Sequence, residues 1–276
     1  MFWKKDLLFC DINPTCYAIS QYKEISKRHV KDFLSRQRFA STMQREELPV
    51  TVSSHQSNMI KRSPGVDIST QENKLANIVI ACGLLDGLII YPGEVFSFWR
   101  IVGKTTLKRG FLDGRVLQRN GLTTGIGGGL CNLANTIHLL VLHSPLEVTE
   151  FHNHSDALAP DEHGRVPLSA GTSVAYNYID FRFANITDQD IQLICRCEGE
   201  ILVAQLRSET QFPWNYEIVE EDHHFAKEGE RYYRISKIYK ATYETASGRL
   251  IDKQLILDNH SRVFFDYALI PQDQIW

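Results

Sequence analysis

The sequence predicts an α+β protein with a helical N-terminal part, a central mixed α/antiparallel-β domain and a β-rich C-terminal extension. Two N-terminal segments repeat apolar residues every three or four positions, and a glycine-rich loop precedes another helical pattern. From residue 146 onward, several segments alternate apolar and polar residues, as strands do. The 276 residues suffice for one large domain or two small ones. We expect a helical region with a linker over 1–67, the central domain over 68–206 and the extension over 207–276.

Composition excludes several classes of function. A net charge of −3 gives no electrostatic reason to expect nucleic acid or an anionic membrane as partner. We find no apolar stretch as long as a signal-peptide core or a membrane helix, so we expect no membrane span and a cytoplasmic location. None of the six cysteines has zinc-finger spacing, so we expect no structural zinc site. In a reducing compartment all six should be free thiols.

The N-terminal half contains two predicted helices. The first covers 15–39, with one apolar face and one basic face, and we interpret the basic face as its solvated side. The polar segment 40–66 is interpreted as a linker. The second helix is predicted to begin near Ser69, with Glu72 completing a capping box. Cys82 belongs to its apolar stripe and is expected to be buried and inert.

Alternating segments in the second half predict an antiparallel sheet. Cys195 and Cys197 alternate with Arg196, so both sulfur atoms should point to one face and pack in the core. Ser247-Gly248 is predicted to form a hairpin turn. The expected strands are Leu146–Glu150, Thr172–Phe183, Asp190–Cys197, Ile201–Leu206, 231–244 and 250–258.

The segment GIGGGLC, residues 125–131, carries the main chemical signal. A helix beginning near Cys131 would place its thiol at the positive end of the helix dipole, which lowers a thiol pKa and favours the nucleophilic thiolate. The N–H groups of the Gly127–Gly129 loop, including Gly128, would stabilise an oxyanion. His152 and His154 would supply the base, which completes an apparatus for acyl transfer.

Other interpretations of these residues remain open. A glycine-rich turn before a helix also cradles phosphate, although no GxxxxGK[ST] pattern is present. The loop would equally serve as a tight turn with an inert buried thiol, and His152 with His154 would serve as half of a metal site. His138 and His143 are expected to be packing residues or helix caps.

Four segments together resemble the VanW domain over roughly residues 68–206. They are YPGEVFSFWRIVG at 91–103, GIGGGLCNLANT at 125–136, PLEVTEFHNHS at 145–155 and DFRFAN at 180–185. Some secreted relatives are understood to be L,D-transpeptidases of peptidoglycan that use the cysteine of GGGxC. The resemblance therefore implies that Cys131 is the nucleophile and that His154 best fits the histidine position.

The resemblance also implies supporting residues and no cofactor. Glu94, Ser97 and Arg100 would line or brace the site, and Asp180 would orient the histidine or hold the backbone. Two positions depart from the family pattern: Asn132 replaces the usual Gln, and Thr172-Ser173 replace Asp-Ala.

We therefore expect a cysteine-dependent acyl transferase or hydrolase that acts on cell-wall peptides, linked by resemblance to glycopeptide resistance. The alternative is a non-catalytic module that binds a peptidoglycan precursor through the same groove.

Overall fold

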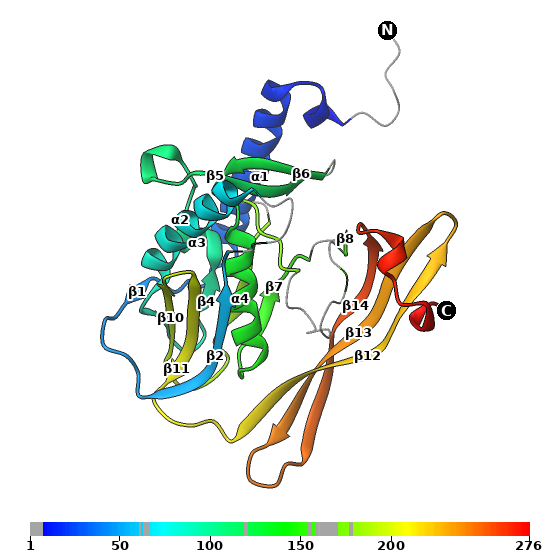
Figure 1. Ribbon diagram of the computed structural model, residues 1–276. Helices are drawn as coiled ribbons and strands as arrows, with labels where there is room; N and C mark the ends of the chain where they lie inside the picture. Colours follow the sequence, from blue (N-terminus) through cyan, green and yellow to red (C-terminus); the bar gives the residue numbers. More distant parts are fainter. Residues whose placement is uncertain are drawn as a thin grey trace.

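The computed structural model describes residues 8–60, 62, 67–118, 121–153, 156–157, 160, 171–176 and 179–276, and it has the predicted α+β architecture. Figure 1 shows α1 at one end of the molecule and a sheet of long strands near the C-terminus. The α-helices of the described residues are α1 (Pro14–Leu34), α2 (Ile68–Leu85), α3 (Phe98–Val102) and α4 (Leu130–Leu142). Short 3-10 helices are η1 (Phe9–Asp11), η2 (Leu107–Arg109), η3 (Tyr267–Leu269) and η4 (Gln272–Gln274).

A five-stranded antiparallel sheet forms the base of the central domain. Its order is β1 (Thr42–Met43), β3 (Leu88–Ile90), β10 (Ile191–Glu198), β11 (Ile201–Ser208) and β2 (Val50–Asn58). α2 packs against β10, while α4 packs against β2 and β11. The core between them contains Ile78, Leu85, Ile137, Leu193 and Leu206, all buried. The apolar stripe of α2, the strand at β10 and the strand at β11 are confirmed.

β2 corrects the interpretation of 40–66 as a linker. Its residues pair in register with β11, from Asn58 opposite Ile201 to Val50 opposite Ser208. As an edge strand rich in Ser, His and Gln, it exposes much of its length and lacks the apolar alternation that predicts a strand.

A three-stranded sheet brings distant motifs together. Its order is β4 (Val95–Ser97), β9 (Arg182–Ala184) and β7 (Glu147–Glu150). The rings of Phe96 and Phe183 stack with centroids 4.7 Å apart, and Phe181 packs against both. Burial of this aromatic cluster holds the strand ends in fixed positions. β7 agrees with its prediction, whereas of the predicted strand Thr172–Phe183 only the last two residues lie in β9.

A two-stranded ribbon, β5 (Asp113–Gln118) and β6 (Gly121–Ile126), leads into the glycine-rich loop and α4. Neither strand was expected. β5 packs beside α2, so the ribbon fixes the approach of the chain to the loop.

The C-terminal extension contributes β12 (Trp214–Glu228), β13 (Arg231–Glu244) and β14 (Leu250–Val263) to a four-stranded sheet. Its fourth strand, β8 (Asp156–Ala157), comes from the preceding region and pairs with β14. β13 has the predicted bounds, β14 runs further than predicted, and β12 was not predicted. The turn at Ser247-Gly248 is confirmed, with Gly248 at φ +68°. Lys240 of β13 donates to the carbonyl of Ser144 at 2.6 Å, just beyond α4, and thereby joins this sheet to the central domain.

Two helices differ from expectation. α1 ends at Leu34 rather than at residue 39, and most of its apolar side chains are exposed, including Tyr22 and Phe33. α2 is capped by the carboxylate of Asp67, which accepts from the N–H of Ser69, rather than by Ser69.

Candidate functional site

Cys131 lies where the sequence predicts it, at the second residue of α4. Gly129 is the N-cap in a left-handed conformation, φ +98°, which a residue with a side chain rarely adopts. The thiol therefore lies in the first turn of the helix, at the positive end of its dipole.

Contacts with neighbouring backbone and side chains explain the glycines. A Cβ on Gly128 would lie 2.1 Å from the carbonyl carbon of Gly114, because ribbon and loop cross in direct backbone contact. Cβ atoms on Gly127 and Gly129 would meet Thr105 and Lys74 at 2.5 and 2.1 Å. The N–H groups of Gly127 and Gly128 donate to Leu112 and Gly125 at 2.9 and 3.0 Å. Those two donors are therefore engaged in holding the turn.

Asn77 of α2, which the sequence analysis did not single out, anchors the loop. Its amide nitrogen donates to the carbonyls of Gly128 and Leu112, and its amide oxygen accepts from the Leu112 N–H. The residue is fully buried, and all its polar atoms are paired in this way. An Asn on the buried side of an apolar helix stripe was the available signal for this role.

The Cys131 thiol donates a weak hydrogen bond to the carbonyl of Val174, with sulfur and oxygen 3.7 Å apart. Burial raises the pKa of the Cys131 thiol, and backbone hydrogen bonds of Val174 and Cys131 itself only partly oppose this. The net direction is opposite to that expected from the helix dipole alone. The thiol in this state is therefore protonated at neutral pH.

Asn132 follows Cys131, and its Oδ1 atom is buried without a hydrogen-bond partner among the described residues. A buried carbonyl oxygen without a partner costs free energy, so an N–H donor from a bound molecule would be favourable there. This is one of the two positions at which the chain departs from the family pattern.

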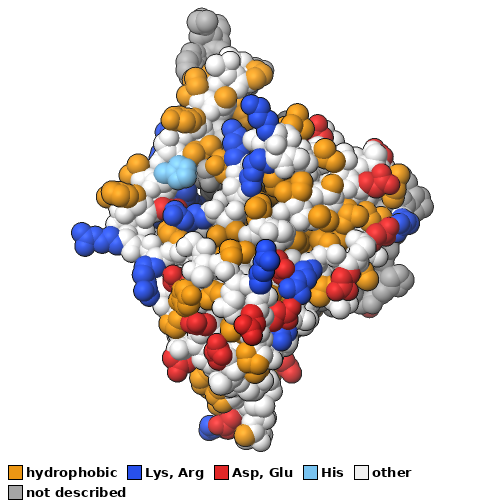
Figure 2. Space-filling view, turned by 90° about the vertical axis from the view of Figure 1, so that its left-hand side faces the viewer, with side chains coloured by type: hydrophobic (Ala, Val, Ile, Leu, Met, Phe, Trp, Pro, Cys, Tyr) orange, Lys and Arg blue, Asp and Glu red, His pale blue; other side chains and the backbone are white. Residues whose placement is uncertain are grey.

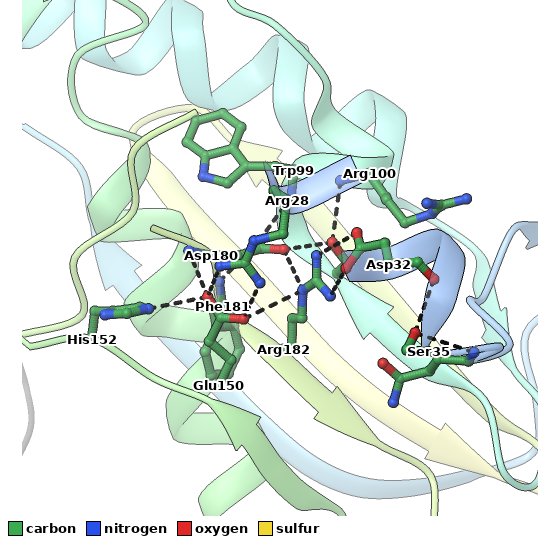
Figure 3. A network of polar contacts seen from close by, with 12 residues as sticks. Arg28, Asp32, Ser35, Trp99, Arg100, Glu150, His152, Asp180, Phe181 and Arg182 are labelled. Carbon is green, nitrogen blue, oxygen red and sulfur yellow. Dashed lines mark hydrogen bonds and ion pairs between the residues drawn. The ribbon is translucent and has the colours of Figure 1, made fainter. Parts of the chain in front are cut away.

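His152 is held by Glu150 rather than by Cys131. Its Nε2 atom lies 3.1 Å from Glu150 Oε1 (Figure 3), and no hydrogen bond joins it to Cys131 in the described part of the chain. With Nε2 donating to the carboxylate, Nδ1 is the nitrogen left to accept a proton. His154 lies outside the described residues.

Glu150 is half-buried and binds several other residues of the site. Arg28 of α1 binds it with both terminal nitrogens, at 2.5 and 2.6 Å (Figure 3). Burial alone would raise the pKa of Glu150, but hydrogen bonds from Arg28 and His152 lower it overall. The carboxylate is therefore ionised and fixes the orientation of His152.

Asp180 is buried and holds the backbone, one of the two roles that the resemblance implied. It accepts from Ser97 Oγ at 2.6 Å, from the Trp99 N–H at 3.1 Å and from Arg182 Nε at 2.7 Å. Ser97 also caps α3 through the N–H of Arg100. Asp180 thus ties β4, α3 and β9 together without contacting His152 directly.

Two further charges come from α1, those of Arg28 and Asp32. We call the whole set the Asp180 network; its members are Arg28, Asp32, Ser97, Glu150, His152, Asp180 and Arg182. Arg182 donates to both oxygens of Asp32, which lies on α1 (Figure 3). Burial would lower the pKa of Arg182, but Asp32 and Asp180 raise it, so the guanidinium stays charged. Sequence analysis missed Arg28 and Asp32, because an ion pair between segments over 100 residues apart leaves no local pattern.

A cavity of about 290 Å³ opens beside this network. Ser97, Arg100 and Asp180 line it, together with Trp99 and Tyr176. The indole of Trp99 meets the Tyr176 ring edge-on, with centroids 5.7 Å apart. The segment 171–176 therefore contacts Cys131 at Val174 and lines the cavity two residues later.

His138 and His143 have structural roles, as predicted. His138 is buried against Phe151 and bonds Thr172 Oγ1 at 3.2 Å, and burial lowers its pKa to about 3. Thr172 in turn donates to Asn135 Oδ1 at 2.9 Å. His143 is the C-cap of α4. Thr172, the second departure from the family pattern, is therefore part of the packing behind the Cys131 helix.

Glu94 does not join the other predicted residues. Its carboxylate accepts from the N–H of Tyr91 at 3.1 Å and braces the turn that precedes β4. Among the described residues, we find no group of three His, Cys, Asp or Glu side chains arranged to hold a metal ion.

Comparison with known proteins decides the family. The profile described as VanW like protein matches residues 73–207. The chain is also 26% identical, over 227 residues, to the vancomycin B-type resistance protein VanW of Enterococcus faecalis, covering 82% of each chain. Residues 73–207 of the chain are therefore assigned to the VanW family. This agrees with the resemblance carried by its four motifs.

A second protein similar to this chain is the uncharacterized protein YoaR of Bacillus subtilis. It is 26% identical over 140 residues, which are 51% of this chain and 45% of YoaR. No solved structure matches the chain. In the described part of the chain, no helix combines the length and apolar character needed to cross a membrane.

Proposed function

We propose that the chain acts on a cell-wall peptide in glycopeptide resistance, as an acyl transferase or hydrolase with Cys131 as nucleophile. The observation that carries this proposal is the position of Cys131 in the first turn of α4, beside the unpaired Oδ1 atom of Asn132. The name of its Enterococcus faecalis relative supports the link to vancomycin resistance.

The reaction needs a base to activate the protonated thiol. His152 would accept the proton at Nδ1 while Glu150 holds Nε2, and His154 is the alternative base. The sulfur would attack the acyl carbon of a peptide bond, forming a thioester and releasing an amine that takes up the proton. Attack by water, or by a second amine, on the thioester would regenerate the thiol.

An oxyanion would be stabilised by N–H groups of the glycine loop and the first turn of α4. Because Gly127 and Gly128 already donate within the loop, we assign the larger share to the helix start at Gly129 and Leu130.

Cleavage of synthetic cell-wall stem peptides, followed by mass spectrometry, tests the proposal. Cys131→Ala should abolish turnover and thioester formation, whereas Cys16→Ala, which changes a cysteine of α1, should retain both. Full turnover by Cys131→Ala would refute catalysis at this residue.

The second candidate function is precursor binding without catalysis. It is favoured by the cavity, in which Arg100, Trp99 and Tyr176 offer a cation and two aromatic rings to an anionic peptide. In that case stem peptides should bind wild type and Cys131→Ala equally, and Trp99→Ala should weaken binding. Calorimetric titration of the three proteins separates the two functions.

A further inference from the structure

The exposed face of α1 is the most unusual surface of the molecule. Tyr22, Phe33 and Leu34 are 73%, 84% and 70% exposed, and Ile19 and Val30 exceed half. At 3.6 residues per turn, these five side chains fall within an arc of about 120°, which we call the α1 apolar face. A helix normally buries such a stripe in the core of its own domain.

α1 instead attaches to the protein by its polar side. Asp32 is the buried residue of this helix, and it pairs with Arg182, while Arg28 pairs with Glu150. These two residues lie roughly opposite the centre of the apolar face. The ion pairs therefore orient the helix so that its apolar face points outward.

Lysines border the α1 apolar face. Lys23, Lys27 and Lys31 follow one another at four-residue intervals along one edge, and all three are exposed. Figure 2 shows hydrophobic side chains at the end of the molecule where α1 lies, with Lys and Arg side chains beside them. The net charge of the whole chain conceals this local basic region.

We propose that α1 lies in the surface of an anionic lipid bilayer, with its apolar face inserted and its lysines on the headgroups. A basic amphipathic helix with aromatic and aliphatic side chains on one face binds membranes in this manner. The 21 residues of α1, about 32 Å in length, would lie along the bilayer plane.

Charge argues against a second copy of the chain as the occupant. Two such faces packed together would bring six lysines toward one seam. The acidic residues of α1 are Glu24, which is bonded to Lys27, and Asp32, which is buried against Arg182. Glu24 offsets the charge of Lys27, so Lys23 and Lys31 of each copy would still repel one another, whereas anionic headgroups would balance their charge.

This orientation has a consequence for the cavity, because Arg28 and His29 of α1 also line it. Docking would place the cavity near the lipid surface, where lipid-linked cell-wall precursors are found. That consequence rests on the proposed function, whereas membrane binding itself does not.

Flotation with vesicles tests the inference. The full chain should float with vesicles of about seven parts phosphatidylcholine to three parts phosphatidylglycerol, and poorly with phosphatidylcholine alone. Tyr22→Ser/Phe33→Ser should weaken partitioning roughly tenfold or more. Leu250→Ser/Leu255→Ser, which changes exposed apolar residues of β14, is the matched control and should float normally.

A second pair of variants tests the charges. Lys23→Gln/Lys27→Gln/Lys31→Gln should weaken binding to the anionic vesicles by roughly tenfold or more, and high salt should do the same to wild type. Lys104→Gln/Lys108→Gln/Lys227→Gln, with three exposed lysines changed elsewhere, should bind as wild type does. Unchanged melting curves confirm folding of every variant.

Three results would overturn the inference. The first is that wild type binds neither kind of vesicle, and the second is that it binds neutral and anionic vesicles equally well. The third is a dimer, detected by light scattering, that Tyr22→Ser/Phe33→Ser converts to a monomer, which would assign the face to a second copy. Turnover by Cys131 is irrelevant to all three readouts, so failure here is distinguishable from failure of the proposed function.

Discussion

Arg182 and Asp32, 150 residues apart in sequence, form a buried ion pair with N–O distances of 2.7 and 2.9 Å. The pair connects the N-terminal helix to the strand that follows Asp180. The position of α1 therefore depends on charge pairing more than on apolar contact.

Arg182→Met should lower the free energy of unfolding by about 3–5 kcal/mol, because it leaves Asp32 and Asp180 buried without their cation. Arg62→Met is the matched control, since Arg62 also pairs with a carboxylate, Glu200, but at an exposed position. There the loss should be much smaller, because solvent screens an exposed ion pair. Chemical denaturation measures both, and equal losses would contradict the assigned role of burial.

Gly128→Ala should destabilise the fold by about 3 kcal/mol or more, because the added Cβ would collide with the backbone of Gly114. Gly125→Ala, three residues earlier, places its Cβ no closer than 3.5 Å to Val116. It should cost no more than about 1 kcal/mol. Thermal melting of the two variants is a direct comparison, and a harmless Gly128→Ala would show that the loop can separate from the ribbon.

Asn77→Ala should cost about 2–4 kcal/mol, since the backbone groups of Leu112 and Gly128 lose their buried partner. Asn73→Ala, one turn earlier on α2, removes a single exposed bond to Asp113 and should cost less than about 1 kcal/mol. Denaturant titration gives both values. Similar losses at the two positions would show that Asn77 does not anchor the loop.

His138 should make the free energy of unfolding decrease as the pH becomes acidic. Burial and then Lys240 lower the pKa of His138 from 6.5 to about 3, so the neutral ring is favoured in the folded state. The unfolded chain binds an additional proton between those values, and stability therefore falls as pH drops below about 6.5 toward 3.

The slope from this residue should be about 1.4 kcal/mol per pH unit in that window. His138→Gln should reduce the slope, whereas His260→Gln, at an exposed position, should leave it unchanged. Denaturation curves at several pH values measure it, and identical slopes for all three proteins would contradict the assignment.

Thiol chemistry distinguishes the cysteines. Burial raises the pKa of Cys131, so its thiolate fraction at neutral pH is small, and its alkylation should accelerate as pH rises toward 9 and above. Cys82 and Cys195, with sulfur atoms 3.2 Å apart in the core, should resist alkylation until the protein unfolds. Site-resolved mass spectrometry measures each rate. Rapid alkylation of Cys131 at neutral pH would instead indicate an activated thiolate.

Local patterns predicted local structure well. Glycine at the N-cap correctly marks the start of α4, and the alternation of 231–244 matches β13. The spacing of Cys195 and Cys197 correctly predicts a shared face, since both sulfur atoms contact that of Cys82.

Contacts between distant segments were not predictable in this way. Periodicity showed that α1 is amphipathic, but the interpretation of its basic face as the solvated side was incomplete. Arg28 contacts the protein and the apolar side chains are exposed, because the orientation depends on Glu150 and Arg182 far along the chain. Glu150 is a charged residue of a type usually found on the surface, and only the pairing of β7 with β9 brings it to Arg28. Ser97 and Asp180 were identified through motif resemblance alone.

The contacts of Lys240 determine how far the protein can be shortened from its C-terminal end and remain stable. The family match ends at residue 207, yet this lysine of the extension donates to the carbonyl of Val141 in the last turn of α4 and to that of Ser144 just beyond it. A chain shortened to residue 208 would expose Leu139 and Leu142, which pack against Ile238. The helix that carries Cys131 in its first turn would then lose support at its far end, about 20 Å away. Recombinant production and gene fusion should therefore preserve the extension, even though it lies outside the recognised family boundary.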